Sequence, residues 1–439
     1  MRPEDFGAKG DGVANDTEAF AAMSAHVNRL GGGTIILRQA TYLVGLQAPT
    51  RSASWSFEPS GIMEFHGLTR ELTISGNGAR LKCAPDLRFG AFDSLSGASL
   101  LRIGPNYALG ERATPYLAMI KVMDCHAPLE IADLELDGSL PELRIGGQYG
   151  DTGRQIPATG LFLGENHSSE TIRNLHTHHH ALDGITIDGD PERIARSRFE
   201  NVVSEFNGRQ GASLVGGRGY DFFGCKFNST GRSTLISAPG AGVDIEAEGS
   251  KQNRDLTFTD CEFSSNSGPG MVADSGDSAN VTFTRCTFVG TKSWSAWPNK
   301  PRFRFDDCVF VGSLAHAYSA PDPVQAAQFH HCAFDDRARS GDRTVYLGGH
   351  AFGSIADLDI GENVLFEGCD FNLTSDAQLP WSVRAIYRAC TMNQTSIRPS
   401  YPRGTFAGRT VINGNAVLSG STIVGEVILN GRRLPEVHL

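Results

Sequence analysis

Four carboxylates occupy outward positions of a short motif that recurs along the middle of the chain. The motif is a glycine followed by residues that alternate between apolar and polar, as in G-I-T-I-D-G at 184–189. In an extended strand, alternate side chains point to opposite faces, so the apolar residues face one side and the acids face the other. The acids are Asp188, Asp244, Glu246 and Asp274.

Carboxylates in this arrangement suit two kinds of chemistry. Adjacent parallel strands lie about 4.8 Å apart and alternate residues about 6.6–7 Å apart, which brings Asp244, Glu246 and Asp274 within reach of one sugar. Like charges this close repel, so either one acid is protonated or a cation lies between them. A protonated acid suits glycoside hydrolysis, whereas a cation predicts a divalent metal site, such as calcium, on these three residues. A solvated acidic face is the simpler alternative.

Basic residues lie in the turns before two of these strands. His178 and His180 precede the strand at 184–189, and Arg209 lies in the corresponding turn one coil later. We expect His180 and Arg209 to act catalytically, because His or Arg can abstract the C5 proton of a uronate and Arg can neutralise its carboxylate. We expect His178 to contact substrate, and a structural histidine in this row is the alternative.

Two loops carry side chains suited to binding a sugar. Trp294 and Trp297 lie in the segment W-S-A-W-P-N-K, and aromatic faces pack well on pyranose rings. Lys300 in the same segment is expected to bind an anionic sugar. Tyr149 and Arg154, in a polar loop earlier in the chain, are expected to form the other end of the groove. A loop that only plugs the core is the alternative for the tryptophans.

The elements that position these residues are the strands of a solenoid. The glycine-led motif recurs every 24–31 residues, and a second motif of the form F-x-x-C-x-F recurs in the second half, as at 258–263. Units of this length are typical of a β-solenoid. We expect Phe and Cys to point inward and form ladders of like residues. The nine cysteines include no C-x-x-C pair, which argues against zinc ligation.

We predict one domain over the whole chain, with a cap and first strands at 1–45, coils with inserted loops at 46–408 and terminal coils or a small sheet at 409–439. An amphipathic helix is expected near the N-terminus, with Asp16 as its N-cap and the glycines from Gly31 as its end. Such a helix would cover the open, unpaired end of the solenoid.

Composition excludes several partners. The net charge of −10 and the absence of a basic run argue against nucleic acid. No stretch approaches the roughly 20 continuous apolar residues of a membrane span. The 51 glycines are scattered along the chain and indicate many tight turns. Nothing in the composition specifies an oligomeric state.

The opening D-F-G-A-K-G-D-G-V-A-N-D-T-E-A-F at 5–20, with G-G-G-T-I-I-L at 31–37 and T-Y-L-V-G at 41–45, resembles the pectate-lyase-like superfamily. The resemblance implies an all-β fold, a right-handed parallel β-helix over nearly the whole chain. It also favours a secreted or periplasmic protein whose leader is absent here, with a cytoplasmic protein as the alternative. Neither the Gly-His-Gly pattern of polygalacturonases nor the Asp-Pro-His pattern of mannuronan epimerases is present, so no catalytic residues are carried over.

These patterns favour a carbohydrate-active enzyme that cleaves a uronic-acid-containing polysaccharide or oligosaccharide by β-elimination. A divalent cation is the expected cofactor, and no organic cofactor is expected. A glycoside hydrolase that uses two of the same carboxylates and a C5-epimerase are the enzymatic alternatives. A non-catalytic, tailspike-like solenoid that binds polysaccharide is the alternative from another class.

Overall fold

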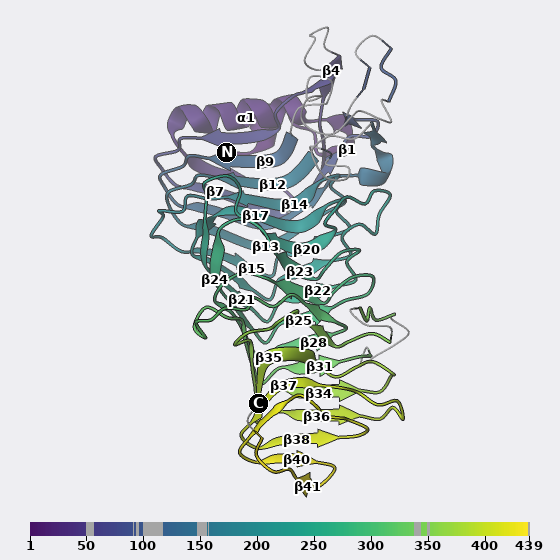
Figure 1. Cartoon of the computed structure of the whole chain (residues 1–439). Coiled ribbons are helices and arrows are strands. Elements are labelled where there is room, and N and C mark those ends of the chain that lie inside the picture. Colours follow the sequence, from purple (N-terminus) through teal and green to yellow (C-terminus); the bar gives the residue numbers. More distant parts are fainter. Residues whose placement is uncertain are drawn as a thin grey trace. The chain divides into compact units, whose positions relative to one another are not determined.

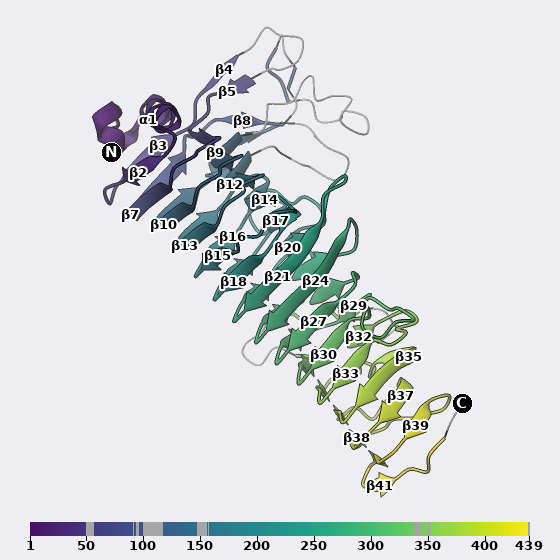
Figure 2. The same cartoon turned by 90° about the vertical axis from the view of Figure 1, so that its left-hand side faces the viewer.

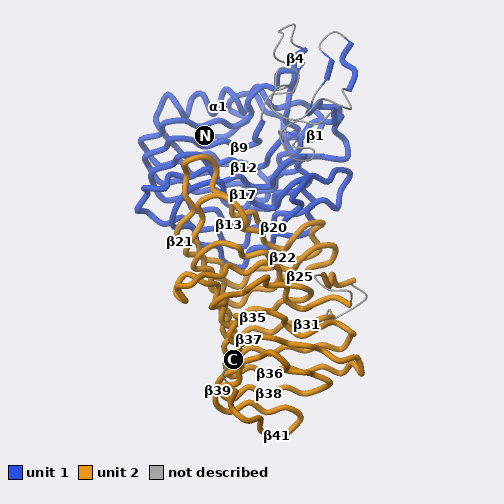
Figure 3. Tube along the Cα trace, viewed as in Figure 1, with its two compact units in different colours: residues 1–241 blue, residues 242–439 orange. Residues whose placement is uncertain are grey.

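The structure is a computed structural model that describes residues 1–49, 57–90, 92–93, 96–99, 117–146, 156, 158–337, 344–348 and 352–437. The chain divides into two compact units, Met1–Ala241 and Gly242–Leu439 (Figure 3). In each unit, short parallel strands from successive coils stack on one another (Figure 1). This arrangement confirms the predicted parallel β-helix. None of the described helices has both the length and the apolar character needed to cross a membrane.

Unit 1 contains two stacked rows of strands that position the candidate site (Figure 2). Row A consists of β6 (Met63–His66), β9 (Leu117–Met123), β12 (Ala158–Gly164), β14 (Asp183–Asp188) and β17 (Gln210–Arg218). Row B consists of β7 (Leu72–Cys83), β10 (Leu129–Asp137) and β13 (Glu170–His178), followed by β15 (Ser197–Glu200) with β16 (Val203–Glu205) and β18 (Tyr220–Phe223) with β19 (Lys226–Asn228). The other elements are η1 (Pro3–Phe6), β1 (Asp11–Asn15), α1 (Thr17–Leu30), β2 (Gly33–Ile36), β3 (Thr41–Val44), β4 (Gln47–Pro49), β5 (Phe57–Pro59), β8 (Arg88–Phe89), η3 (Leu140–Glu142) and β11 (Arg144–Ile145).

Unit 2 continues the pattern in three rows. The first row consists of β20 (Ala241–Ile245), β23 (Met271–Ala273), β26 (Ala296–Pro298), β29 (Leu314–Ala315) and β32 (Ala356–Asp357). The second consists of β21 (Asn253–Thr259), β24 (Ser278–Thr284), β27 (Phe303–Asp306), β30 (Gln328–His330), β33 (Leu365–Glu367), β35 (Trp381–Arg388), β37 (Arg403–Ala407) and β39 (Thr422–Val424). The third consists of β22 (Glu262–Ser264), β25 (Thr287–Val289), β28 (Val309–Val311), β31 (Ala333–Asp335), β34 (Asp370–Leu373), β36 (Thr391–Gln394), β38 (Thr410–Asn413) and β40 (Val427–Leu429). A short antiparallel strand, β41 (Arg432–Arg433), pairs with β40.

The Phe and Cys ladders predicted from the F-x-x-C-x-F motif are present in unit 2. Phe258, Phe283, Phe305, Phe329 and Phe366 stack in one column, with successive ring centroids 4.8–4.9 Å apart. A second column runs beside the first at the phenylalanines that follow the cysteines. All nine cysteines of the chain are buried and free. The apolar core of unit 2 is therefore a set of parallel columns, one side chain per coil.

Helix α1 covers the first coil of unit 1 with its apolar face, whose buried residues include Phe20, Met23 and Val27. It ends at Gly31, which adopts the left-handed conformation with φ 74°, as predicted. Asp16 stands at the N-cap position, but its carboxylate accepts hydrogen bonds from the N–H groups of Lys9 and Gly10 instead of capping the helix. The acid therefore fixes the loop before the helix.

The side-chain alternation predicted for row A and for the first row of unit 2 is confirmed on the inward side. The inward residues are all at most 1% exposed, and they are Ile185, Ile187, Ala212, Leu214, Val243, Ile245, Met271 and Ala273. The outward side differs from a solvated face. Thr186, Ser213 and Val272 point outward and are nevertheless buried. Alternation therefore identifies the core side of these strands without identifying an open surface.

Candidate functional site

A cluster of histidines, carboxylates and cations lies on the outer face of row B in unit 1. Strands β10 and β13 each bend at one residue in the left-handed conformation, Asp133 (φ 57°) and Asn174 (φ 51°). After the bend, outward residues alternate with buried ones such as Leu136. We call the outward set the His–carboxylate face, and it consists of Arg80, Lys82, Glu135, Asp137, His176, His178 and Glu205.

Strand pairing brings these residues into two short ladders. In one ladder, Arg80 on β7 pairs with Glu135 on β10, which pairs with His176 on β13. In the other ladder, Lys82, Asp137, His178 and Glu205 follow one another across β7, β10, β13 and β16. A shallow depression of about 480 Å³ adjoins Glu135 at the bend of the strands. The ladders therefore bring acids, histidines and cations together, and Glu135 is the member of the face that lines the hollow.

His176 is the accessible histidine of this face. Its side chain is 41% exposed, and its Nε2 lies 3.1 Å from Oε1 of Glu205. The ring packs on that of His178, with centroids 4.4 Å apart. A carboxylate on one ring nitrogen fixes the tautomer, which leaves Nδ1 of His176 able to accept a proton.

His178 lies beneath His176 and is only 9% exposed. Its Nε2 is 3.0 Å from Oε1 of Glu135, and its Nδ1 is 2.7 Å from Nδ1 of His179. Burial, with a smaller contribution from His178, lowers the pKa of His179. The expected contact of His178 with substrate stays a prediction. Its position suits it to support the ring of His176.

Asp137 stays ionised in this setting. Burial alone raises the pKa of Asp137, but the hydrogen bond from the N–H of Ser139 and the ion pair with Arg80 outweigh it and lower the pKa. Arg80 also lies 3.1 Å from Glu135 through its Nε. Arg80 compensates only one of the two negative charges of Glu135 and Asp137, and its positive charge disfavours a metal ion beside them. Two groups of this face, Glu135 with His176 and His178, and Asp137 with His178 and His179, nevertheless bring three ligand atoms within 4.8 Å of one another.

The predicted catalytic residues of unit 1 lie elsewhere. His180 is buried, its Nε2 is 3.2 Å from the carbonyl of Leu136, and burial lowers its pKa to about 3. Arg209 forms two hydrogen bonds, of 2.9 and 2.6 Å, with the carboxylate of the fully buried Asp183. Asp188 is half-buried at the end of β14. His180 therefore adjoins the His–carboxylate face, close to His178 and Asp137, but is buried, and Arg209 pairs with an acid outside that face.

The predicted acidic residues of unit 2 have three different environments. Asp244 is 4% exposed and pairs with Val272 on the neighbouring strand, Glu246 accepts a hydrogen bond from the hydroxyl of Ser275, and Asp274 is exposed. Calcium needs six to eight oxygen ligands. Among the described residues, none of the groups that bring three ligand atoms within 4.8 Å of one another includes these acids. We therefore derive no step through a calcium ion at this place.

The predicted sugar-binding residues of unit 2 are half-buried. The ring of Trp294 meets that of Tyr346 edge-on at 5.2 Å, and the ring of Trp297 lies 4.7 Å from that of His316. Lys300 follows β26 in the chain. Tyr149 and Arg154, the other expected members, lie outside the described residues. Sugar binding by all of these residues stays a prediction.

A family model described as "Right handed beta helix region" matches residues 152–310. Among solved structures, the chain is similar to the A-module of the Azotobacter vinelandii mannuronan C-5 epimerase AlgE4 (13% identity, 98% of this chain and 96% of that chain, TM-score 0.48). It is also similar to the tailspike protein gp49 of Pseudomonas phage LKA1 (14%, 98% and 77%, 0.43) and to an exopolygalacturonase of Thermotoga maritima (13%, 100% and 93%, 0.32). No curated protein sequence matches. The stacked parallel strands and this family match show that the chain has a right-handed parallel β-helix fold.

Proposed function

We propose that the chain is a polysaccharide-cleaving enzyme that acts on a uronic-acid-containing polymer by β-elimination at the His–carboxylate face. The observation that carries this proposal is the half-exposed ring of His176, oriented by Glu205 and flanked by acids on the adjacent strands. A polymer substrate also fits a protein that works outside the cytoplasm, so secretion is part of the proposal.

In this reaction His176 takes the proton from C5 of the uronate. The C5–H electrons form the double bond between C4 and C5, and the C4–O bond to the leaving sugar breaks. The electron pair of that bond stays on the leaving oxygen, which takes a proton from water. Glu205 accepts the hydrogen bond of Nε2 and stabilises the imidazolium that forms. The other ring nitrogen is then free for the substrate.

Arg80 and Lys82 are the cations of this face, and a uronate carboxylate would reach them by competing with their present partners, Glu135 and Asp137 for Arg80 and Glu142 for Lys82. Both lie on β7, two strands from β13, which is a separation of about 9.5 Å across the ladder. A polymer that runs across the strands would place one acidic sugar near the cations while another lies at His176.

The charge on Asp137 favours elimination over hydrolysis at this face. A hydrolase needs a carboxylic acid that stays protonated until it gives its proton to the leaving oxygen. Arg80 and Ser139 lower the pKa of Asp137, which is the opposite of what a general acid requires. A C5-epimerase shares the proton abstraction and differs only in returning a proton to C5.

A panel of polyuronates and neutral glycans tests the proposal. The expected result is an unsaturated product from at least one polyuronate, detected by its ultraviolet absorbance. The same assay with and without a chelator tests the predicted divalent cation. His176→Ala should reduce turnover at least about 100-fold, whereas His66→Ala, an exposed histidine on β6, should not.

Three results would contradict β-elimination in different ways. Reducing ends without the unsaturated product indicate a hydrolase, and inverted uronate without cleavage, detected by NMR, indicates an epimerase. Binding without any product indicates a non-catalytic solenoid. Equal turnover of His176→Ala and the unsubstituted chain would remove the His–carboxylate face from the reaction.

A further inference from the structure

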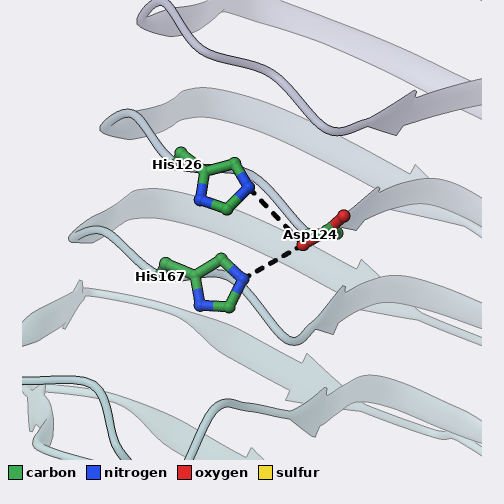
Figure 4. A group of neighbouring side chains, drawn as sticks. All are labelled: Asp124, His126 and His167. Atoms are coloured by element: carbon green, nitrogen blue, oxygen red, sulfur yellow. Dashed lines mark hydrogen bonds and ion pairs between the residues drawn. The ribbon is translucent and has the colours of Figure 1, made fainter.

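A second cluster of ligating side chains lies in the turns that follow row A of unit 1. Asp124 and His126 follow β9, and His167 follows β12, the strand stacked on β9 (Figure 4). Oδ1 of Asp124 lies 3.0 Å from Nε2 of His167 and 3.7 Å from Nε2 of His126. The two imidazole rings are stacked, with centroids 4.5 Å apart and planes 13° apart.

The backbone fixes these turns. The N–H of Asp124 donates to the carbonyl of Gly164, and the N–H of His167 donates to the carbonyl of Cys125, at 2.9 Å in each case. The buried side chain of Asn166 accepts a hydrogen bond from the N–H of Cys125. Because consecutive coils hold each other, the three side chains project from a rigid support.

We propose that Asp124, His126 and His167 bind one divalent transition-metal ion of the zinc type. Two imidazoles and a carboxylate form a donor set that zinc accepts, at about 2.0–2.2 Å from the ion. Ligand atoms around such a tetrahedral ion lie about 3.4 Å from one another. The distances of 3.0 and 3.7 Å lie on either side of this value.

Asp190 completes the site from the next coil. Its Oδ2 lies 2.8 Å from Nδ1 of His167, the nitrogen that would face away from the metal. A carboxylate at this position fixes the tautomer of a ligating histidine and increases its basicity. Three consecutive coils therefore contribute to one site.

The local charge also favours a cation here. Among the residues that the structure describes, no Lys or Arg forms an ion pair with Asp124, whereas Arg80 forms ion pairs with Glu135 and Asp137 of the His–carboxylate face. Asp124, His126 and His167 are all exposed, so an ion can enter and water can fill its remaining position. The bound ion would link two coils of the solenoid, a role that is independent of polysaccharide cleavage.

Zinc titration of the tag-free, chelator-treated chain tests this site. We expect calorimetry to give one zinc ion per chain and a zinc-dependent rise in the thermal midpoint. Asp190→Asn should weaken zinc binding about 10–100-fold, and His167→Ala, which removes a ligand, should weaken it more. The control is the double variant His176→Ala/His178→Ala, which should bind zinc like the unsubstituted chain.

Circular dichroism of each variant establishes that it is folded before the titration. The absence of stoichiometric zinc binding by the unsubstituted chain would overturn the proposal. So would loss of binding in the His176→Ala/His178→Ala control with retention in His167→Ala. If His167→Ala does not fold, His126→Ala, which alters an exposed ligand with fewer contacts, gives the same comparison.

Discussion

His176 and His178 belong to one strand and differ sharply in environment. The first is exposed and bonded to Glu205, whereas the second is nearly buried against Glu135 and His179. A solvent-facing ring held by a carboxylate is suited to accept a proton from a bound ligand, and a buried ring beneath it restricts its motion. The proton abstraction that we propose therefore depends on the difference in exposure between His176 and His178.

Glu205→Gln tests how His176 is oriented. The amide keeps the size of the side chain and removes the charge that stabilises a protonated ring. We expect kcat on the substrate found in the panel to fall at least about tenfold, with KM little changed. Unchanged kcat, with a fold identical by circular dichroism, would contradict the proposed pairing.

His180 makes the stability of the protein depend on pH. Burial lowers its pKa from 6.5 to about 3 in the folded chain, so below pH 6.5 the unfolded chain takes up a proton that the folded chain does not. The free energy of unfolding keeps its full value above pH 6.5, and protonation of His180 in the unfolded chain lowers it by about 1.4 kcal/mol per pH unit as the pH falls toward 3. Urea unfolding at pH 7 and pH 5 should show that the free energy of unfolding falls more between these pH values for the unsubstituted chain than for His180→Gln.

The sequence H-T-H-H-H shows what residue order alone can and cannot predict. The strand alternation of His176 and His178 is visible in the sequence, and so are the acids of L-E-L-D before them. The left-handed conformation of His179, with φ 55°, is not visible. It follows the end of the strand at His178 and precedes the buried His180. Comparison of the alternating polar residues in L-E-L-D at 134–137 with those in H-T-H at 176–178 would have identified the His–carboxylate face.

At the scale of the strands, the repeats predicted the inward side and the ladders correctly. They did not predict which outward side is covered, because burial of an outward residue depends on loops from other coils. Asp244 illustrates the point, since its outward position was predicted and its burial was not. The solenoid was therefore predictable from local periodicity, and its open surface was not.

The phenylalanine columns predict a large stability effect of one substitution. Phe305 is fully buried and stacks on Phe283 and Phe329 at 4.9 and 4.8 Å. Phe305→Ala should lower the free energy of unfolding by about 3–5 kcal/mol, because it removes buried area and leaves a cavity between rings. The measurement is denaturant unfolding, with Phe352→Ala, at a side chain that is 51% exposed, as the control. Equal midpoints for both variants would contradict the ladder.

At the scale of the whole molecule, the cysteines predict a simple chemical property. All nine are buried and free, and burial raises the pKa of Cys83 to about 12. A buried, protonated thiol is a poor nucleophile. An aromatic disulfide reagent should therefore label almost no thiols in the native protein and nine per chain in denaturant. Fast labelling of the native protein would show that the core opens readily.

Helix α1 contributes a property that concerns other copies of the chain. The side-chain amide of Asn28 donates to the carbonyl of Glu64 and accepts from the N–H of His66, so it occupies two backbone positions of the outermost strand, β6. An unsatisfied strand edge is a template on which a second molecule can add. With these positions filled by its own side chain, this end of the stack offers little to seed a filament.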